Sequence, residues 1–277
     1  MSNDSALTGT SDVLTDVQNL PDKRGIAIQQ VGVNSLRYPL IWHETDGSSQ
    51  ASAGVFSLGA SLDADHRGTH MSRFVEHLQK AHMNVSMQQW FDFPRQLAQA
   101  LGARQAQASV TFSLFREVQA PVTGSNGMQE IGVALSSRWF EEKDLAELHF
   151  GITVPVATVC PCSKSISERG AHNQRGTISV SGWLLPSASS SIRIDALASA
   201  IESCASVPLY PVLKRSDEKQ VTEQGYDQAK FVEDVARDTL LMLREQAIFS
   251  AYKVVVENME SIHSHNAFAE IQEGNCE

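Results

Sequence analysis

The sequence predicts an α+β fold in which antiparallel sheets carry helices on one face. Paired segments alternate apolar and polar residues, as half-buried strands do, and segments with amphipathic helical spacing lie between the pairs. The order of strand pair, two helices and strand pair occurs twice along the 277 residues. A sheet with an apolar face must cover it, so this order predicts two tandem units, each with its helices on one face.

The first unit is expected at residues 26–142. Met71, Phe74 and Leu78 share one helical stripe, and Thr69 before them has the residue type of an N-cap. A loop is predicted at 43–52. The predicted elements, in order, are strands at 31–42 and 53–62, helices at 69–82 and 86–101, and strands at 105–118 and 130–137.

The second unit is expected at residues 143–277. Its last helix carries an apolar stripe that includes Val235, Leu240 and Leu243, and the Ser-rich stretch at 186–191 is predicted to be a flexible loop. The predicted elements, in order, are strands at 145–158 and 176–185, helices at 194–203 and 228–246, and strands at 251–257 and 267–273. Unpaired edge strands in both units predict that copies of the chain associate.

Composition excludes several classes of protein. Residues 1–25 are polar and aperiodic, which predicts a disordered N-terminal tail and no secretory signal. A formal net charge of −10 argues against a nucleic-acid binder, and no apolar run approaches the ~18–20 residues of a membrane span. Four cysteines are too few for a disulfide framework. We therefore expect a reduced, cytoplasmic protein.

The richest chemistry lies between residues 160 and 175. Cys160, Cys162 and His172 stand there beside Lys164 and Arg175. A thiolate and an imidazole are metal ligands, and the cations indicate an anion site next to them. The alternatives are a pair of buried free thiols and a surface histidine.

Three polar stretches further on carry weaker signals. In 210–219, Glu218 could supply a metal carboxylate and Lys214 could meet phosphate, or the stretch is a solvated charge run. Glu233 at a helix start suits the helix dipole, or accepts two N–H donors from a base edge. Glu260 and His263 form a general acid–base pair or a polar turn.

One further stretch lies in the first unit. His70 and Arg73 open a predicted helix, where an anion could bind. An ordinary helix start is the alternative.

Together these stretches resemble the type IB GTP cyclohydrolase I family, the prokaryotic enzyme of folate and pterin synthesis. The resemblance implies two tandem tunnelling-fold units per chain and a homotetramer with active sites between subunits. It also implies hydrolysis of GTP to 7,8-dihydroneopterin triphosphate and formate. The matching stretches are 68–74, 160–164, 170–175, 214–219, 231–234 and 260–266.

The resemblance also implies roles for individual residues. Cys160, His172 and Glu218 match the metal-site positions, with Cys160 the essential cysteine. Glu233 matches the carboxylate that anchors guanine, and Glu260 and His263 match positions near the reacting base. The remaining cations are candidates for the triphosphate: His70, Arg73, Lys164, Arg175 and Lys214.

Such a site needs a divalent metal and no redox cofactor. Mixed sulfur, nitrogen and oxygen ligands suit zinc, iron(II) or manganese, and the metal would activate the water that attacks C8 of guanine. Two alternatives stay open. One is an NADPH-dependent nitrile reductase of deazaguanine metabolism with a nucleophilic cysteine, and the other is a non-catalytic, metal-stabilised purine-binding module.

Overall fold

A computed structural model describes residues 16–18, 20–81 and 84–276 of the chain. One continuous sheet runs through it in the order β10-β9-β7-β6-β5-β4-β2-β1-β3, and β8 pairs with β6 off this path. The long strands are all antiparallel to their neighbours, whereas the short β3 pairs parallel with β1. The strands are β1 (Ile28–His43), β2 (Ser49–Leu62), β3 (Asn84–Val85), β4 (Gln105–Gln119), β5 (Asn126–Phe140), β6 (Leu145–Val159), β7 (Asn173–Leu184), β8 (Val207–Pro208), β9 (Phe249–Asn258) and β10 (Ala267–Glu273).

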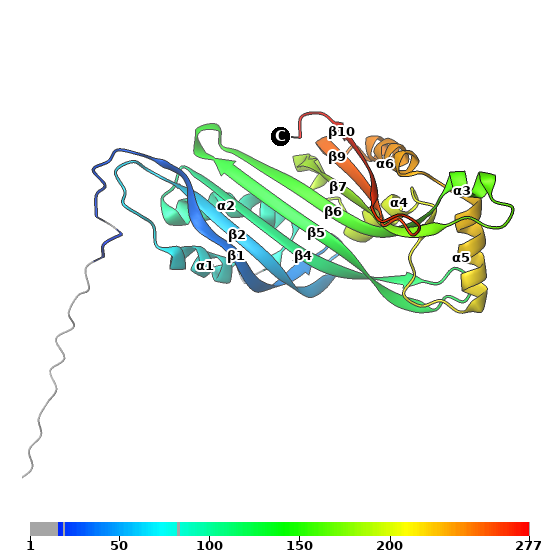
Figure 1. Ribbon diagram of the computed structural model, residues 1–277. Helices are drawn as coiled ribbons and strands as arrows, with labels where there is room; N and C mark the ends of the chain where they lie inside the picture. The colour runs from blue at the N-terminus through cyan, green and yellow to red at the C-terminus, as the bar shows by residue number, and fades with distance from the viewer. Residues whose placement is uncertain (1–15, 19, 82–83, 277) are drawn as a thin grey trace, which may run out of the picture.

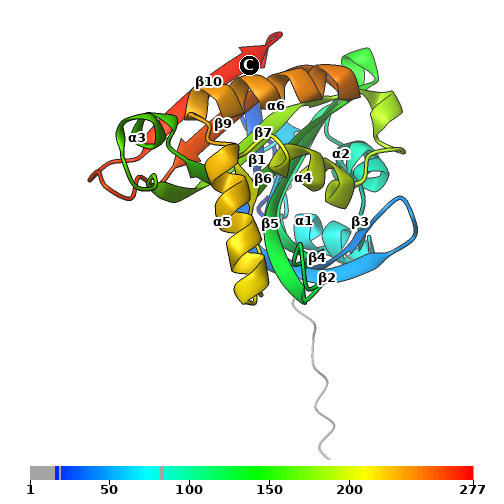
Figure 2. The ribbon, with the colours of Figure 1, turned by 90° about the vertical axis from the view of Figure 1, so that its right-hand side faces the viewer.

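Helices cover one face of this sheet (Figures 1 and 2). α2 packs on β4 and β5, α4 on β6, and α6 on β9 and β10, while α3 and α5 lie at the far end of the sheet. The α-helices are α1 (Met71–Lys80), α2 (Met87–Leu101), α3 (Pro161–Ile166), α4 (Ile194–Glu202), α5 (Arg215–Asp227) and α6 (Val232–Gln246). The described residues also form the 3₁₀ helices η1 (Glu141–Lys143) and η2 (Pro186–Ala188).

The core lies between the sheet and the helices. Along β4, Val110 and Phe112 are buried whereas Thr111 between them is exposed, which is the period-2 alternation expected of a sheet with one covered face. Trp90 of α2 and Phe150 of β6 are at most 1% exposed. Burial of a side chain of this size contributes roughly 1.5–3 kcal/mol to stability.

The open face of the sheet carries small side chains. Thr153 and Ser179 of neighbouring strands share a hydrogen bond of 3.0 Å there. With Ala134 and Ser181 they line a shallow hollow of about 530 Å³. No helix in the described part of the chain is long and apolar enough to cross a membrane.

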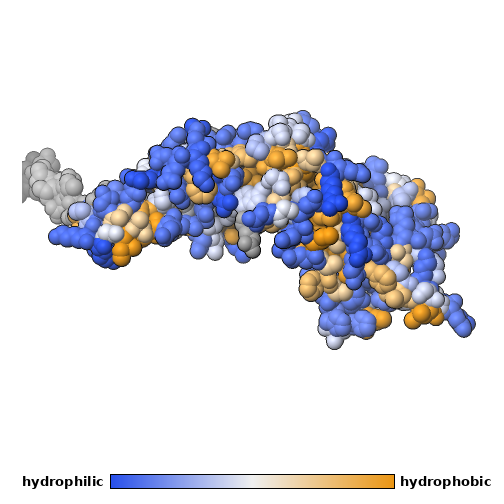
Figure 3. All heavy atoms as spheres, turned by 90° about the horizontal axis from the view of Figure 1, so that it is seen from above, coloured by the Kyte–Doolittle hydropathy of each residue, from blue (hydrophilic) through white to orange (hydrophobic). Residues whose placement is uncertain are grey.

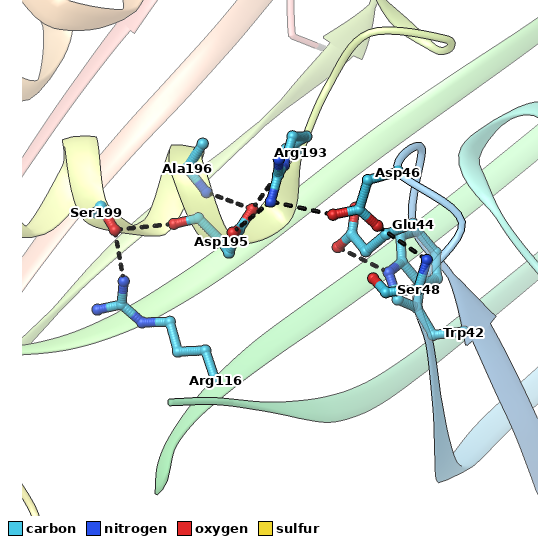
Figure 4. Close-up of polar contacts among 9 residues, drawn as sticks. All are labelled: Trp42, Glu44, Asp46, Ser48, Arg116, Arg193, Asp195, Ala196 and Ser199. Atoms are coloured by element: carbon cyan, nitrogen blue, oxygen red, sulfur yellow. Dashed lines mark hydrogen bonds and ion pairs between the residues drawn. The ribbon is translucent and has the colours of Figure 1, made fainter. Parts of the chain in front are cut away.

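A group of ion pairs and hydrogen bonds joins the β1–β2 turn to the start of α4 (Figure 4). The Arg193 guanidinium lies 3.2 Å from Asp46 and 2.8 Å from Asp195. Trp42 Nε1–H donates to Glu44 at 2.9 Å. Burial raises the pKa of Glu44, against the hydrogen bonds from Trp42 and the Ile194 N–H that lower it. These contacts fix the N-terminal half of the sheet to the helix layer of the C-terminal half.

The α+β class and the helix-covered antiparallel sheet are confirmed, but several local predictions were wrong. The loop expected at 43–52 is shorter, because β2 begins at Ser49. The Ser-rich 186–191 stretch is not a free loop, since Ser189 is 4% exposed and donates to Gln88. His70, not Thr69, occupies the N-cap position of α1, and the expected helix end at 82 lies outside the described residues.

The N-terminal tail prediction covers two kinds of residue. Residues 1–15 lie outside the described part of the chain. Beyond them, Gln18 donates to the Thr69 carbonyl at 3.1 Å, and Pro21 forms a β-bridge with His66. Gln18 and Pro21 are therefore held against residues just before α1, and the free-tail prediction does not hold for them.

Candidate active site

The ends of β6 and β7 bring Cys160 and His172 together. Val159 pairs with Asn173 in the antiparallel register, so Cys160, which follows Val159, faces His172, which precedes Asn173. The Cys160 N–H donates to the His172 carbonyl at 3.1 Å. Cys160 is also the N-cap of α3, where its Sγ accepts the Ser163 N–H at 3.5 Å. The thiol and the imidazole are thereby held at one end of the sheet, both half-buried.

His172 is held by polar neighbours on several sides. Its N–H donates to Ser163 Oγ at 3.2 Å, and its Nδ1 lies 3.1 Å from Gln174 Oε1. Ser261 Oγ approaches the same Nδ1 at 3.4 Å. These contacts occupy Nδ1 and its side of the ring.

The segment that carries Glu260 and His263 reaches this end through β9. The Met259 N–H donates to the Arg175 carbonyl at 2.8 Å, so the segment leaves the sheet beside β7. Glu260 is half-buried. His263 is exposed and stacks on His265 with 5.2 Å between ring centroids. Both predicted acid–base residues thus lie on the segment that contacts His172 through Ser261.

Glu233 and Lys164 belong to the same end of the molecule. The Lys230 N–H donates to the Val159 carbonyl at 3.1 Å, which places the first turn of α6, with exposed Glu233, beside the end of β6. Lys164 Nζ donates to the Tyr226 carbonyl at 2.5 Å and lies 4.4 Å from the centroid of that ring. Lys164 therefore joins α3 to the end of α5.

A cavity of about 260 Å³ lies between α5 and the ends of β6 and β7. Arg175, Tyr210 and Gln174 are among its lining residues, and Val221 of α5 faces them. Glu218 is exposed one helical turn before Val221, on the same face of α5. It thus stands at the margin of this cavity, at the end of α5 remote from Tyr226.

The charged stretch at 210–219 is partly a helix, because α5 begins at Arg215. Asp217, which is fully buried, accepts N–H groups from Lys214, Val122 and Thr123 at 2.9 Å each, and the Thr123 hydroxyl at 2.7 Å. Burial alone would raise the pKa of Asp217, but these hydrogen bonds outweigh it and hold the pKa well below its usual range. The Lys214 side chain itself is exposed.

His70 and Arg73 lie at the opposite end of the molecule, on α1 (Figure 1). His70 Nε2 lies 3.0 Å from an Asp16 carboxylate oxygen, and Arg73 is exposed. Both residues line a small cavity of about 140 Å³. Within one chain, these two candidates do not join Cys160 and His172.

One chain brings only some of the predicted metal ligands together. Among the described residues, no three His, Cys, Asp or Glu side chains group closely enough to hold an ion. Cys160 and His172, whose backbone groups are hydrogen-bonded, carry a thiol and an imidazole, which fit a zinc-like cation in their chemistry. Glu218 is not brought to them in one chain.

Comparison with known proteins decides the family. The family model described as type I GTP cyclohydrolase folE2 matches residues 14–269. The chain belongs to this family. It is 40% identical over 257 residues to GTP cyclohydrolase FolE2 of Fervidobacterium nodosum, which covers 93% of this chain and 96% of that protein. It is also 40% identical to GTP cyclohydrolase FolE2 of Akkermansia muciniphila, over 94% of this chain and 97% of that one.

Solved structures similar to this FolE2 family member include uricases. The uricase from Arthrobacter globiformis superposes with a TM-score of 0.53 over 88% of this chain and 92% of its own, at 6% identity. The uricase from Bacillus fastidious gives a TM-score of 0.51, also at 6% identity. At such low identity the likeness concerns the fold alone, and it is consistent with the predicted tunnelling fold.

The sequence interpretation missed Gln174 and Ser261 as neighbours of His172. Gln174 is 7% exposed and lies in phase with the buried Ile178 and Val180 of β7. A polar residue at an inward position of a strand is itself a signal, because its buried polar atoms need partners. That signal was present in the alternation of residues 174–184.

Proposed function

We propose that this chain hydrolyses GTP to 7,8-dihydroneopterin triphosphate and formate. The observation that carries the proposal is the convergence of Cys160, His172 and the segment with Glu260 and His263 in a member of the FolE2 family. The named GTP cyclohydrolases at 40% identity support the substrate. A cytoplasmic location stays a prediction.

Cys160 and His172 would hold a divalent cation, zinc, iron(II) or manganese, with Glu218 as the third ligand. Such a cation, when bound, supplies Lewis acidity that lowers the pKa of water from ~15.7 towards ~7. Glu233 would accept the N–H groups of the guanine edge and fix C8 in place. His263 would give a proton to the ring nitrogen that leaves C8 and later recover it, with Glu260 beside it on the same segment. No step is a net oxidation, so a redox cofactor is not needed.

We further propose a homotetramer with active sites between subunits. Arg73 and His70 lie far from Cys160 in one chain, so triphosphate contacts from α1 would have to come from a second copy. Among the described residues, no strand pairs with the outer edge of β10 and only the two-residue β3 pairs with that of β1. The β9–β10 hairpin exposes Phe268 at 72% and Ile262 at 64%. Apolar residues also break up the hydrophilic surface on the face seen in Figure 3. A second copy would cover such edges.

The tandem-unit prediction belongs to the same proposal. The strands of the first half lie in the order β1-β2-β4-β5, those of the second half in the order β6-β7-β9-β10, and β5 pairs with β6 at the junction. In each half the longer helices, α1 and α2 in the first and α4, α5 and α6 in the second, lie between the second and third long strands, whereas the short α3 lies between β6 and β7. This repeated arrangement supports two tunnelling-fold units, at 26–142 and 143–277.

The decisive assay is formate release from GTP, with pterin fluorescence after oxidation as a second readout. Metal-free protein should be inactive and should recover when one of the three metals is added. The Cys160→Ala variant should lose turnover under all conditions, whereas Cys276→Ala near the C-terminus should keep it. Near-normal pterin formation by Cys160→Ala would overturn the role of Cys160, and NADPH consumption without formate would favour a reductase.

The intersubunit site has its own test. Cys160→Ala and Arg73→Ala proteins, each inactive, would be unfolded together and refolded as a mixture. Because each site takes residues from two chains, about a quarter of the sites in random mixed oligomers should be intact and activity should return. A mixture as inactive as its two components would contradict shared sites.

A further inference from the structure

We propose that Gln174 is a positioning residue that holds the ring proton of His172 on Nδ1. The unprotonated Nε2 is then the atom with which His172 binds its ligand. The inference rests on the proposed function for the identity of that ligand, a divalent cation. The hydrogen-bond arrangement itself is a property of the chain without metal.

The two ends of the Gln174 amide are held separately. Its Nε2–H donates to Thr158 Oγ1 at 3.0 Å, and its Oε1 lies 3.1 Å from His172 Nδ1. Gln174 is 7% exposed and Thr158 fully buried, so water does not compete for these bonds. Thr158 and Gln174 are paired directly across β6 and β7. Val159 separates Thr158 from Cys160, and Asn173 separates Gln174 from His172.

An amide oxygen can only accept, so the atom opposite it must carry hydrogen. With Oε1 facing Nδ1, the neutral imidazole carries its proton on Nδ1 and leaves Nε2 bare. A histidine that ligates a metal commonly donates its other N–H to an oxygen in this way, and loss of that oxygen typically weakens metal binding 10- to 100-fold. Ser261 Oγ, at 3.4 Å from Nδ1 and exposed, is too distant to set the tautomer.

The amide orientation is what the experiment must decide. In the reverse orientation, the Thr158 hydroxyl would donate to Oε1 and Nε2–H would donate to a bare Nδ1, which would put the ring proton on Nε2. Gln174→Glu separates the two cases, because both carboxylate oxygens accept: one from Nδ1–H, the other from the Thr158 hydroxyl. Gln174→Met keeps the length of the side chain and removes both polar ends.

The first measurement is ¹⁵N NMR of imidazole-labelled, metal-free protein at about pH 8, above the ordinary histidine pKa of about 6.5. The His172 signal is assigned by its loss in His172→Gln. We expect the Nδ1–H form in wild type and in Gln174→Glu, and a mixture of tautomers in Gln174→Met. A wild-type ring protonated at Nε2, or a tautomer that changes in Gln174→Glu, would overturn the inference.

The second measurement is the affinity for Zn²⁺ alone, by competition with a chromophoric chelator. Gln174→Met should bind 10- to 100-fold more weakly than wild type. Gln174→Glu should bind within a few-fold of wild type or more tightly. Circular dichroism of all three proteins checks that they are folded. Folded Gln174→Met with wild-type zinc affinity would refute the positioning role.

The two proposals fail separately. Protein without cyclohydrolase activity that still shows the Nδ1–H tautomer and the Gln174-dependent zinc affinity would overturn the substrate and leave Gln174 in its role. An active enzyme whose His172 tautomer does not change when Gln174 is replaced by Met would overturn the role of Gln174 and leave the proposed substrate standing.

Discussion

Gly176 lies at a close approach between β7, which begins directly after His172, and β9, which leads to the segment with Glu260 and His263. It pairs with Asn258 across β7 and β9. A Cβ at this position would lie 2.4 Å from Asn258 Oδ1 and 2.5 Å from the Glu257 carbonyl oxygen. Because one of these atoms belongs to the backbone, a rotamer change cannot relieve both contacts. Gly176→Ala must therefore push β7 and β9 apart at the point where the segment with Glu260 and His263 begins.

Overpacking of this kind costs about 1–3 kcal/mol, so Gly176→Ala should lower the free energy of unfolding by that amount. It should also lower kcat, because the displacement falls on the segment that contacts His172. Gly132→Ala is the matched control, since its Cβ would meet Thr153 Cβ at an ordinary 3.5 Å in the same sheet. Urea unfolding and formate release would be measured on both. If Gly176→Ala matched Gly132→Ala in stability and turnover, the steric argument would be wrong.

Three further outcomes follow from other contacts. Arg116 and Glu202 form a buried ion pair that Gln129 bridges, so Arg116→Met should cost about 3–5 kcal/mol in urea unfolding, and an unchanged midpoint would contradict it. Because folding lowers the pKa of Asp217, its carboxylate stabilises the folded protein at pH values above its ordinary pKa of 3.8, and this stabilisation is lost as the pH falls below 3.8. Asp217→Asn should therefore melt at a lower temperature than wild type near neutral pH, and the difference between the two melting temperatures should narrow below pH 3.8. Exposed Glu233 is proposed to anchor guanine through charged hydrogen bonds of ~1.5–3 kcal/mol, so Glu233→Gln should raise KM for GTP roughly 10- to 100-fold with an unchanged melting temperature.

The sheet could be predicted because its signals are local. Each long strand alternates buried and exposed residues over many positions, and β10 begins and ends at the predicted residues. Helix α5 could not be predicted in this way, because its sequence is polar and carries no apolar stripe. What starts it is Asp217, whose partners Val122 and Thr123 lie 95 and 94 residues earlier, in the β4–β5 turn. A helix fixed by a tertiary contact gives no periodic signal in its own sequence.

The candidate site divides along the same line. Cys160 and His172 directly follow and precede two strands that pair with each other, so the hairpin register alone puts them side by side. The position of Glu218 depends on where α5 packs, and that of Arg73 depends, in our proposal, on a second chain. No spacing within the sequence encodes such distances. Motif spacing therefore reports reliably on residues joined by one hairpin and not on residues from separate helices.

This difference also indicates how the site is built. The thiol and imidazole are positioned by backbone hydrogen bonds at the end of the sheet, where little can move them. Of the groups proposed to bind the base and the triphosphate, Glu233 lies in the first turn of α6 and Arg73 in that of α1, and both are exposed. A substrate as large as GTP needs contacts on several sides, and one chain offers them only at opposite ends. Reactive groups fixed within a chain and binding groups shared between chains would make catalysis depend on assembly, while a cation could still bind to the single chain through Cys160 and His172.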